Sequence, residues 1–102
     1  MSRQYRLSPQ ARQEMLEIGD FVAESSVEAA LKIYDVLEAA FALLAENPGI
    51  GHLREDLTDR PVKFWPVFSY YVVYDPASSN PLEILSVVHG AREVARLLTE
   101  DR

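Results

Sequence analysis

The side chains that could take part in chemistry lie mostly in the second half of the chain. His89 follows an apolar run at residues 82–88 and precedes Gly90, so it stands at the end of a predicted strand, where it could move a proton. A lone histidine in such a position more often hydrogen-bonds the backbone and fixes a turn, and we favour that interpretation. His52 lies in a loop after Gly51, and neither histidine has further ligands at metal-binding spacing. We therefore expect no metal and no other cofactor.

Five cations could gather on one side of the molecule and bind a target: Arg54, Arg60, Lys63, Arg92 and Arg96. Arg92 and Arg96 are four residues apart in a helical pattern, so they share one face. They either pair with nearby acids or form a positively charged surface that binds a target. Trp65 lies two residues after Lys63, on the same face of a predicted strand, and aromatic and cationic side chains are common anchors of protein interfaces. An ordinary edge-strand face is the alternative for this pair.

The distribution of charge argues against a nucleic-acid ligand. The net charge is −6, and residues 9–47 alone hold eight acids against two cations. We interpret these acids as a solvated helix face. Because nucleic-acid affinity comes mostly from neutralised phosphates, such a surface opposes it. Only a local basic cluster in the second half could reverse this.

Length and composition indicate a single domain over residues 1–102. About half of the residues are hydrophobic (48%), which is enough for one ordinary core. There is no cysteine, so disulfides and thiolate metal sites are excluded and a reducing cytoplasm is expected. No apolar stretch has the length of a signal peptide core or a membrane span, so we expect a cytoplasmic protein without membrane contact.

The periodicity of apolar residues predicts an α+β domain. A short strand at residues 4–7 leads into Ser8-Pro9, which begins a helix that extends to about residue 24. Ser26 alone, or Ser25 with Glu28, caps a second helix that ends at Asn47. The short link between the two helices requires an antiparallel hairpin.

Three strands and a short helix follow. Residues 62–68, 70–74 and 82–88 are rich in β-branched and aromatic side chains, residues 75–81 form a hairpin loop, and residues 91–98 return to a helical pattern. Pro66 places the first of these strands at a sheet edge or bulge. The run 70–74 is apolar on both faces, which is typical of a central strand. We expect a helical hairpin on one face of an antiparallel sheet, with the other face open.

The second helix has more apolar surface than one contact needs. Val27, Leu31 and Tyr34 extend one flank of its main stripe, and Val36 and Leu43 extend the other. Leu16 is an additional apolar residue on the first helix. These six residues either belong to a well-buried central helix or form a groove for a partner.

Several segments resemble the RelE/ParE toxin superfamily over nearly the whole chain. They are residues 7–11 (LSPQA), 23–30 (AESSVEAA), 44–57, 64–67 together with 70–74, and the ending 82–94 (LEILSVVHGAREV). That ending is similar to the pattern I-L-R-V-L-H-G-A-R of the ParE branch. Ser86 stands where this pattern has arginine, and the chain is more acidic than expected for a toxin whose antitoxin is commonly acidic.

The resemblance implies the toxin of a type II toxin–antitoxin system, with the RelE/ParE-like β-α-α-β-β-β fold. It implies a non-enzymatic protein that binds DNA gyrase through the sheet side and the C-terminal segment. A ParD-like ribbon-helix-helix antitoxin would neutralise it and would carry any DNA binding. The surplus apolar residues of the helices would then receive an amphipathic antitoxin helix.

Two alternatives remain open at this point. One is a ribosome-dependent mRNA endonuclease of the RelE type, which needs several cations and a proton donor around the phosphate. Ala95 stands about where that branch often has tyrosine, and Lys63 is the one cation inside the three later strands. The other alternative is a detoxified interaction module.

Overall fold

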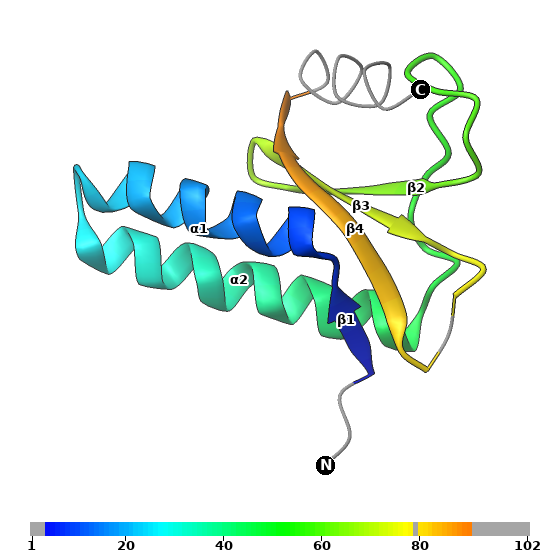
Figure 1. Ribbon diagram of the computed structural model, residues 1–102, viewed down its shortest axis with the longest axis horizontal. Coiled ribbons are helices and arrows are strands. Elements are labelled where there is room, and N and C mark those ends of the chain that lie inside the picture. Colours follow the sequence, from blue (N-terminus) through cyan, green and yellow to red (C-terminus); the bar gives the residue numbers. More distant parts are fainter. Residues whose placement is uncertain (1–3, 79, 91–102) are drawn as a thin grey trace.

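The computed structural model describes residues 4–78 and 80–90. Its elements follow the predicted order, and the helix predicted at residues 91–98 lies outside the described residues, as do Arg92 and Arg96. The elements are β1 (Tyr5–Leu7), α1 (Pro9–Ala23), α2 (Val27–Glu46), β2 (Lys63–Val67), β3 (Tyr70–Asp75) and β4 (Leu82–His89) (Figure 1).

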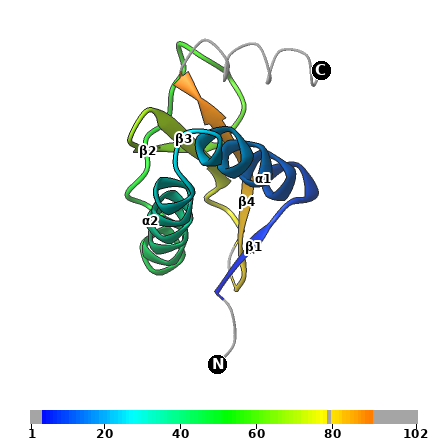
Figure 2. The ribbon, with the colours of Figure 1, turned by 90° about the vertical axis from the view of Figure 1, so that its left-hand side faces the viewer.

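Both helices begin where the sequence predicts. The Ser8 hydroxyl accepts a hydrogen bond from the Ala11 N–H, and Pro9 occupies the first helical position, where its missing N–H costs nothing. Ser26, rather than Ser25, caps α2 by accepting from the Ala29 N–H. The two helices lie side by side as an antiparallel hairpin against one face of the sheet (Figure 2).

The sheet has the order β1-β4-β3-β2 and is mixed rather than antiparallel throughout. The predicted antiparallel pairing holds for β2, β3 and β4, whereas β1 runs parallel to β4, with Leu7 opposite Ile84. A parallel pair needs a long crossover, and here the helical hairpin and the β2–β3 hairpin separate the two strands in the chain. As predicted, β3 is central and the strand that contains Pro66 is at an edge.

The edge of β2 is closed to further strands. His52 exchanges two backbone hydrogen bonds with Phe64, at 2.9 and 2.8 Å. Two residues later, Pro66 has no N–H to offer. His52 therefore pairs with the sheet through its backbone, and its ring lies parallel to that of Trp65, with 6.3 Å between the centroids. Edges blocked in this way resist pairing with another chain.

The sheet has an apolar cluster on each face. The face away from the helices was expected to be open, but it is partly covered. The main core lies between helices and sheet and is built around Leu37, Phe41, Tyr74 and other buried side chains. The opposite face holds a second cluster, which the segment before β2 helps to build. Its members are Val62, Phe64, Val73 and Val88, with Leu57, Tyr71 and Leu85 packed against them.

Tyr74 anchors the segment that leaves α2. Its ring is fully buried, and its hydroxyl donates to the Pro48 carbonyl at 2.7 Å and accepts from the Gly51 N–H at 2.9 Å. A Cβ at position 51 would lie 2.3 Å from this oxygen, so glycine is required for the close approach. Burial raises the pKa of the Tyr74 hydroxyl above its ordinary value.

Candidate protein-binding surfaces

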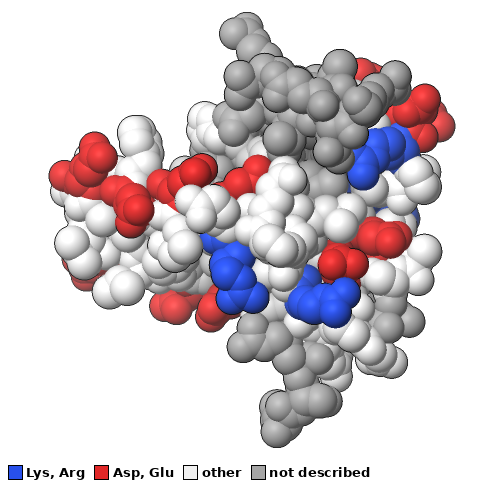
Figure 3. Space-filling model, in the orientation of Figure 1, with Lys and Arg blue, Asp and Glu red and all other residues white. Residues whose placement is uncertain are grey.

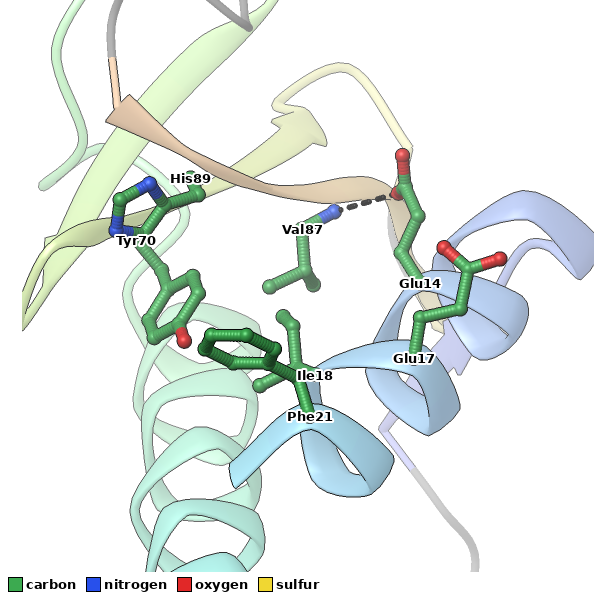
Figure 4. Close-up of a pocket in the computed structure, with 7 residues that line it drawn as sticks. All are labelled: Glu14, Glu17, Ile18, Phe21, Tyr70, Val87 and His89. Carbon is green, nitrogen blue, oxygen red and sulfur yellow. Dashed lines mark hydrogen bonds between the residues drawn. The ribbon is translucent and has the colours of Figure 1, made fainter. Parts of the chain in front are cut away.

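A pocket of about 330 Å³ lies between α1 and the end of β4 (Figure 4). Its lining comes from α1, from the start of β3 and from the end of β4: Glu14, Glu17, Ile18, Phe21, Tyr70, Val87 and His89. Figure 4 shows the two carboxylates at one end, the Tyr70 and His89 rings at the other, and apolar side chains between them. The pocket is therefore amphipathic along its length, which suits an elongated side chain with one charged end.

Glu14 ties α1 to the free part of the β4 edge. Strand β1 pairs with β4 only as far as Ile84, and beyond this point the β4 edge faces α1. There the Glu14 carboxylate accepts hydrogen bonds from the Ser86 hydroxyl at 2.7 Å and from the Val87 N–H at 2.9 Å. The interpretation of the hairpin acids as a purely solvated face is thus wrong for Glu14, which is half-buried and structural.

The aromatic end of the pocket involves His89. Its ring meets Tyr70 edge to face, with 5.1 Å between the centroids. The expected hydrogen bond from the imidazole to the backbone is not found among the described residues, and the turn is instead fixed by the Gly90 N–H, which donates to the Ser69 carbonyl. Gly90 has a φ of 77°, a conformation that glycine adopts readily.

Two phenylalanines near this end are unusually exposed. Phe21 is 71% exposed and Phe68 is 69% exposed. Phe68 also has a φ of 56°, which is costly for a residue with a side chain. Together with Ser69, Tyr70 and residues of α2, Phe68 lines a second pocket, so Tyr70 separates two adjacent hollows. Exposed aromatic rings beside hollows are typical of protein interaction sites.

The six residues considered as a partner groove do not form one surface. Leu16, Val27, Leu31 and Leu43 are exposed, whereas Tyr34 and Val36 are half-buried and pack against the core. Leu31 and Leu43 lie on opposite flanks of α2, roughly 120° apart. Leu16, Val27 and Leu31 remain as exposed apolar residues on the flanks where the helices meet. There the Tyr34 hydroxyl comes so close to Gly19 that a Cβ would clash with it.

The proposed target-binding residues fall on two sides of the sheet. Arg54 and Arg60 line one hollow in the segment before β2. The Arg54 guanidinium forms an ion pair with Asp56 at 2.8 Å and donates to the Tyr71 hydroxyl at 3.3 Å. The hydrogen bonds that the Arg54 guanidinium donates to the Asp56 carboxylate raise the pKa of Arg54 and lower the pKa of Asp56.

Lys63 and Trp65 belong to the other side. Trp65 packs partly against the main core, on the face that the helices cover, and the Lys63 Nζ donates to the Gly49 carbonyl at 3.1 Å. They share a strand face as predicted, but the sheet separates them from Arg54 and Tyr71. The structure therefore brings together Arg54 with Arg60, and Lys63 with Trp65, as two pairs.

Acidic side chains gather over the free end of the helical hairpin, at the left of Figure 3. Within residues 4–78 and 80–90, no group of three or more histidine, aspartate and glutamate residues could hold a metal ion. No helix in the same part of the chain is long and apolar enough to cross a bilayer.

Sequence reasoning did not select Glu14, Glu17 and Phe21 as a site. Their spacing of three and four residues places them, with Ile18, on one flank of α1, next to the core stripe. The sequence signal for this site was two acids, an apolar residue and an aromatic residue on one flank of α1. These residues form a pocket only because β4 ends beside that flank, which the sequence alone does not determine.

Two comparisons with known proteins find similarity. The family model described as the ParE toxin of the type II toxin–antitoxin system parDE matches residues 5–94. A solved structure described as the chromosomal ParDE TA system from P. aeruginosa has 18% identical residues and a TM-score of 0.66, and the alignment covers 87% of this chain and 99% of that chain. At this identity the structural likeness shows the fold alone. No curated protein matches the chain.

Proposed function

Because the chain belongs to the ParE toxin family of type II toxin–antitoxin systems, we propose that it inhibits DNA gyrase by binding it and is neutralised by a cognate ribbon-helix-helix antitoxin. The observation that carries this proposal is the family match, which spans nearly the whole domain. The protein breaks no bond itself in this mechanism. It acts in the cytoplasm, and its contact with DNA is indirect, through the antitoxin complex.

The surface of the sheet supports a protein target over an RNA substrate. Strands β2, β3 and β4 contain one Lys or Arg, Lys63, and its ammonium group is engaged with the Gly49 carbonyl. Arg6 in β1 pairs with Glu83 at 3.4 Å. RNA cleavage needs several cations around the scissile phosphate, and the described strands offer no such group.

The outer side of the helical hairpin is the proposed antitoxin surface. Val27 is 65% exposed, Leu31 is 59% exposed and Leu16 is 52% exposed. Large apolar side chains with this exposure lose contact with water when an amphipathic helix covers them, which contributes roughly 25 cal/mol for each Å² buried. The Arg54 side of the sheet is then available for the target.

Gyrase supercoiling assays and ribosome-dependent mRNA cleavage assays distinguish the alternatives. We expect the purified protein to inhibit supercoiling or to trap cleaved DNA, and to leave translated mRNA intact. Addition of the antitoxin, which we expect a short neighbouring gene to encode, should restore supercoiling and serves as the control. Cleavage of mRNA on ribosomes would establish the nuclease instead. Loss of both activities, with no growth inhibition, would indicate a detoxified module.

A further inference from the structure

We propose that the pocket between α1 and β4 receives a Lys or Arg side chain of the antitoxin, flanked by an apolar residue. The proposal rests on the proposed function, because it assumes that an antitoxin binds this chain. It adds the chemistry of one contact, which the sequence resemblance does not specify.

The acidic end of the pocket is not neutralised from within the described part of the chain. Gln10 donates to Glu14 at 3.4 Å and Gln13 donates to Glu17 at 3.2 Å, but neither carboxylate forms an ion pair with a described cation. Glu14 has one oxygen engaged by Ser86 and Val87. Two carboxylates at one end of a hollow attract a positive charge, and the half-buried position of Glu14 weakens the screening of its part of that attraction.

The middle of the pocket fits the aliphatic stem of such a side chain. Ile18 and Val87 line the middle of the pocket, and the exposed Phe21 ring forms one of its walls (Figure 4). Lys and Arg bury their methylene groups on apolar surface while the charged end reaches a polar group. The volume of about 330 Å³ is small compared with most ligand pockets, which span roughly 300–1,000 Å³, and therefore favours a few side chains over a large ligand.

The C-terminal residues of the same chain are a weaker candidate for this pocket. They begin directly after His89 and Gly90, but residues 91–102 contain three arginines and three acids, so they bring no net positive charge. The antitoxin is favoured over the target because the pocket lies on the helix-covered side of the sheet. Arg54 and Arg60, proposed for the target, lie over the other side.

The test measures the affinity of the antitoxin for variants of the full chain. Glu17 is suited to substitution because it is exposed and, unlike Glu14, forms no hydrogen bond with the described backbone of β4. We expect Glu17→Gln to weaken binding about three- to tenfold, with the loss disappearing at high salt, and Phe21→Ala to weaken it about tenfold. Glu46→Gln removes the same charge from the exposed end of α2 and should leave the affinity unchanged.

A double-mutant cycle identifies the partner side chain. Each Lys and Arg in the C-terminal half of the antitoxin is replaced by Gln, and its binding is measured against the parent chain and Glu17→Gln. One of these cations should show coupling, so that Glu17→Gln costs little once that cation is absent. If every cycle is additive, the proposal is wrong.

Other outcomes would overturn the proposal in distinguishable ways. Failure of the antitoxin to bind the parent chain would refute the proposed function and this contact together. Binding that is equally tight for Glu17→Gln, Phe21→Ala and Glu46→Gln would refute the contact alone. A shift of the Ile18 and Val87 methyl resonances on deletion of residues 91–102 would assign the pocket to the chain's own C-terminus. A dimer that Phe21→Ala dissociates would assign it to a second copy.

Discussion

Glu14 and Ser86 meet across the junction of α1 and β4, where the Ser86 hydroxyl donates to the Glu14 carboxylate at 2.7 Å. Ser86 is only 3% exposed and is the buried polar side chain among the described residues. The same carboxylate oxygen accepts from the Val87 N–H, so one acid satisfies a buried hydroxyl and a strand edge. The position where the ParE pattern has arginine is thus used here to hold the helix to the sheet.

Replacement of Glu14 should separate the effect of its hydrogen bonds from that of its charge. Glu14→Ala leaves the Ser86 hydroxyl and the Val87 N–H without their partner, and we expect the free energy of unfolding to fall by about 1–3 kcal/mol. Glu14→Gln keeps an accepting oxygen and should cost less than half as much. Urea denaturation of the three proteins measures both values. Equal losses in the two variants would mean that the charge, rather than the hydrogen bonds, matters.

The buried Tyr74 hydroxyl makes stability depend on alkaline pH. Burial raises the pKa of this group in the folded state above its ordinary value of 10.0, so the folded protein holds the proton more tightly than the unfolded chain. The contribution of this protonated hydroxyl to the free energy of unfolding is therefore complete below pH 10. It is lost as the pH rises from there through the higher pKa of the folded state.

Tyr74→Phe isolates this effect. At neutral pH the variant loses the hydrogen bonds to Pro48 and Gly51, and we expect it to be less stable by about 1–3 kcal/mol. Between pH 9 and 11 its unfolding free energy should fall less steeply than that of the parent. Denaturation curves at several pH values test both points, and parallel pH profiles would contradict the assignment.

The effect of Gly19→Ala on stability should depend on the side chain that faces position 19. A Cβ at this position would lie 1.7 Å from the Tyr34 hydroxyl oxygen, so Gly19→Ala forces the tyrosine ring to move and should destabilise the hairpin. In a Tyr34→Leu background this obstacle is gone, and the higher helix propensity of alanine should stabilise the protein by up to about 1 kcal/mol. Thermal denaturation of the two pairs tests for this reversal of sign. The same sign in both backgrounds would show that Tyr34 adapts freely.

The elements could be predicted because local chemistry determines them. Ser8-Pro9, Ser26 and Asn47 begin or end helices through contacts within a few residues, and Pro66 restricts its strand to an edge. The parallel pairing of β1 with β4 could not be predicted from such contacts, since it joins residues more than seventy positions apart. The role of Glu14 was missed for the same reason: its partner Ser86 is distant in sequence and lies beside it only after the sheet has formed.

The candidate interface shows the same limit. The apolar pattern of α2 correctly indicates surplus surface, but it does not distinguish which flank the sheet covers. The structure buries part of the side chains of Tyr34 and Val36 and leaves Leu31 and Leu43 exposed on different flanks. A single groove that includes all of them is therefore not formed.

Leu31 and Leu43 should differ in their effect on antitoxin binding. Both side chains are exposed, at 59% and 43%, so neither Leu31→Glu nor Leu43→Glu should unfold the protein. Leu31 shares the outer side of the hairpin with Leu16, and a buried carboxylate there should weaken antitoxin binding by about 2 kcal/mol or more. Leu43→Glu serves as the control on the opposite flank. Titration calorimetry measures both affinities, and a greater loss for Leu43→Glu would move the antitoxin to that flank.

Growth arrest on expression of the toxin provides the test of the cationic target surface. Arg54 is held by Asp56 and Tyr71 at a partly exposed position, which leaves less side-chain entropy to lose when a target binds. Arg92 and Arg96 lie outside the described residues and share a face if their segment is helical. We expect Arg92→Ala/Arg96→Ala to abolish growth arrest, and Arg54→Ala to reduce it, while both bind antitoxin as tightly as the parent. Each lost charged hydrogen bond costs about 1.5–3 kcal/mol, enough to weaken a micromolar complex at least tenfold.

The matched control is Arg12→Ala, which removes an exposed cation from α1 and should leave the protein toxic. Full growth arrest by the double variant at equal expression would remove the C-terminal arginines from the mechanism, and loss of antitoxin binding would show that they serve the other partner.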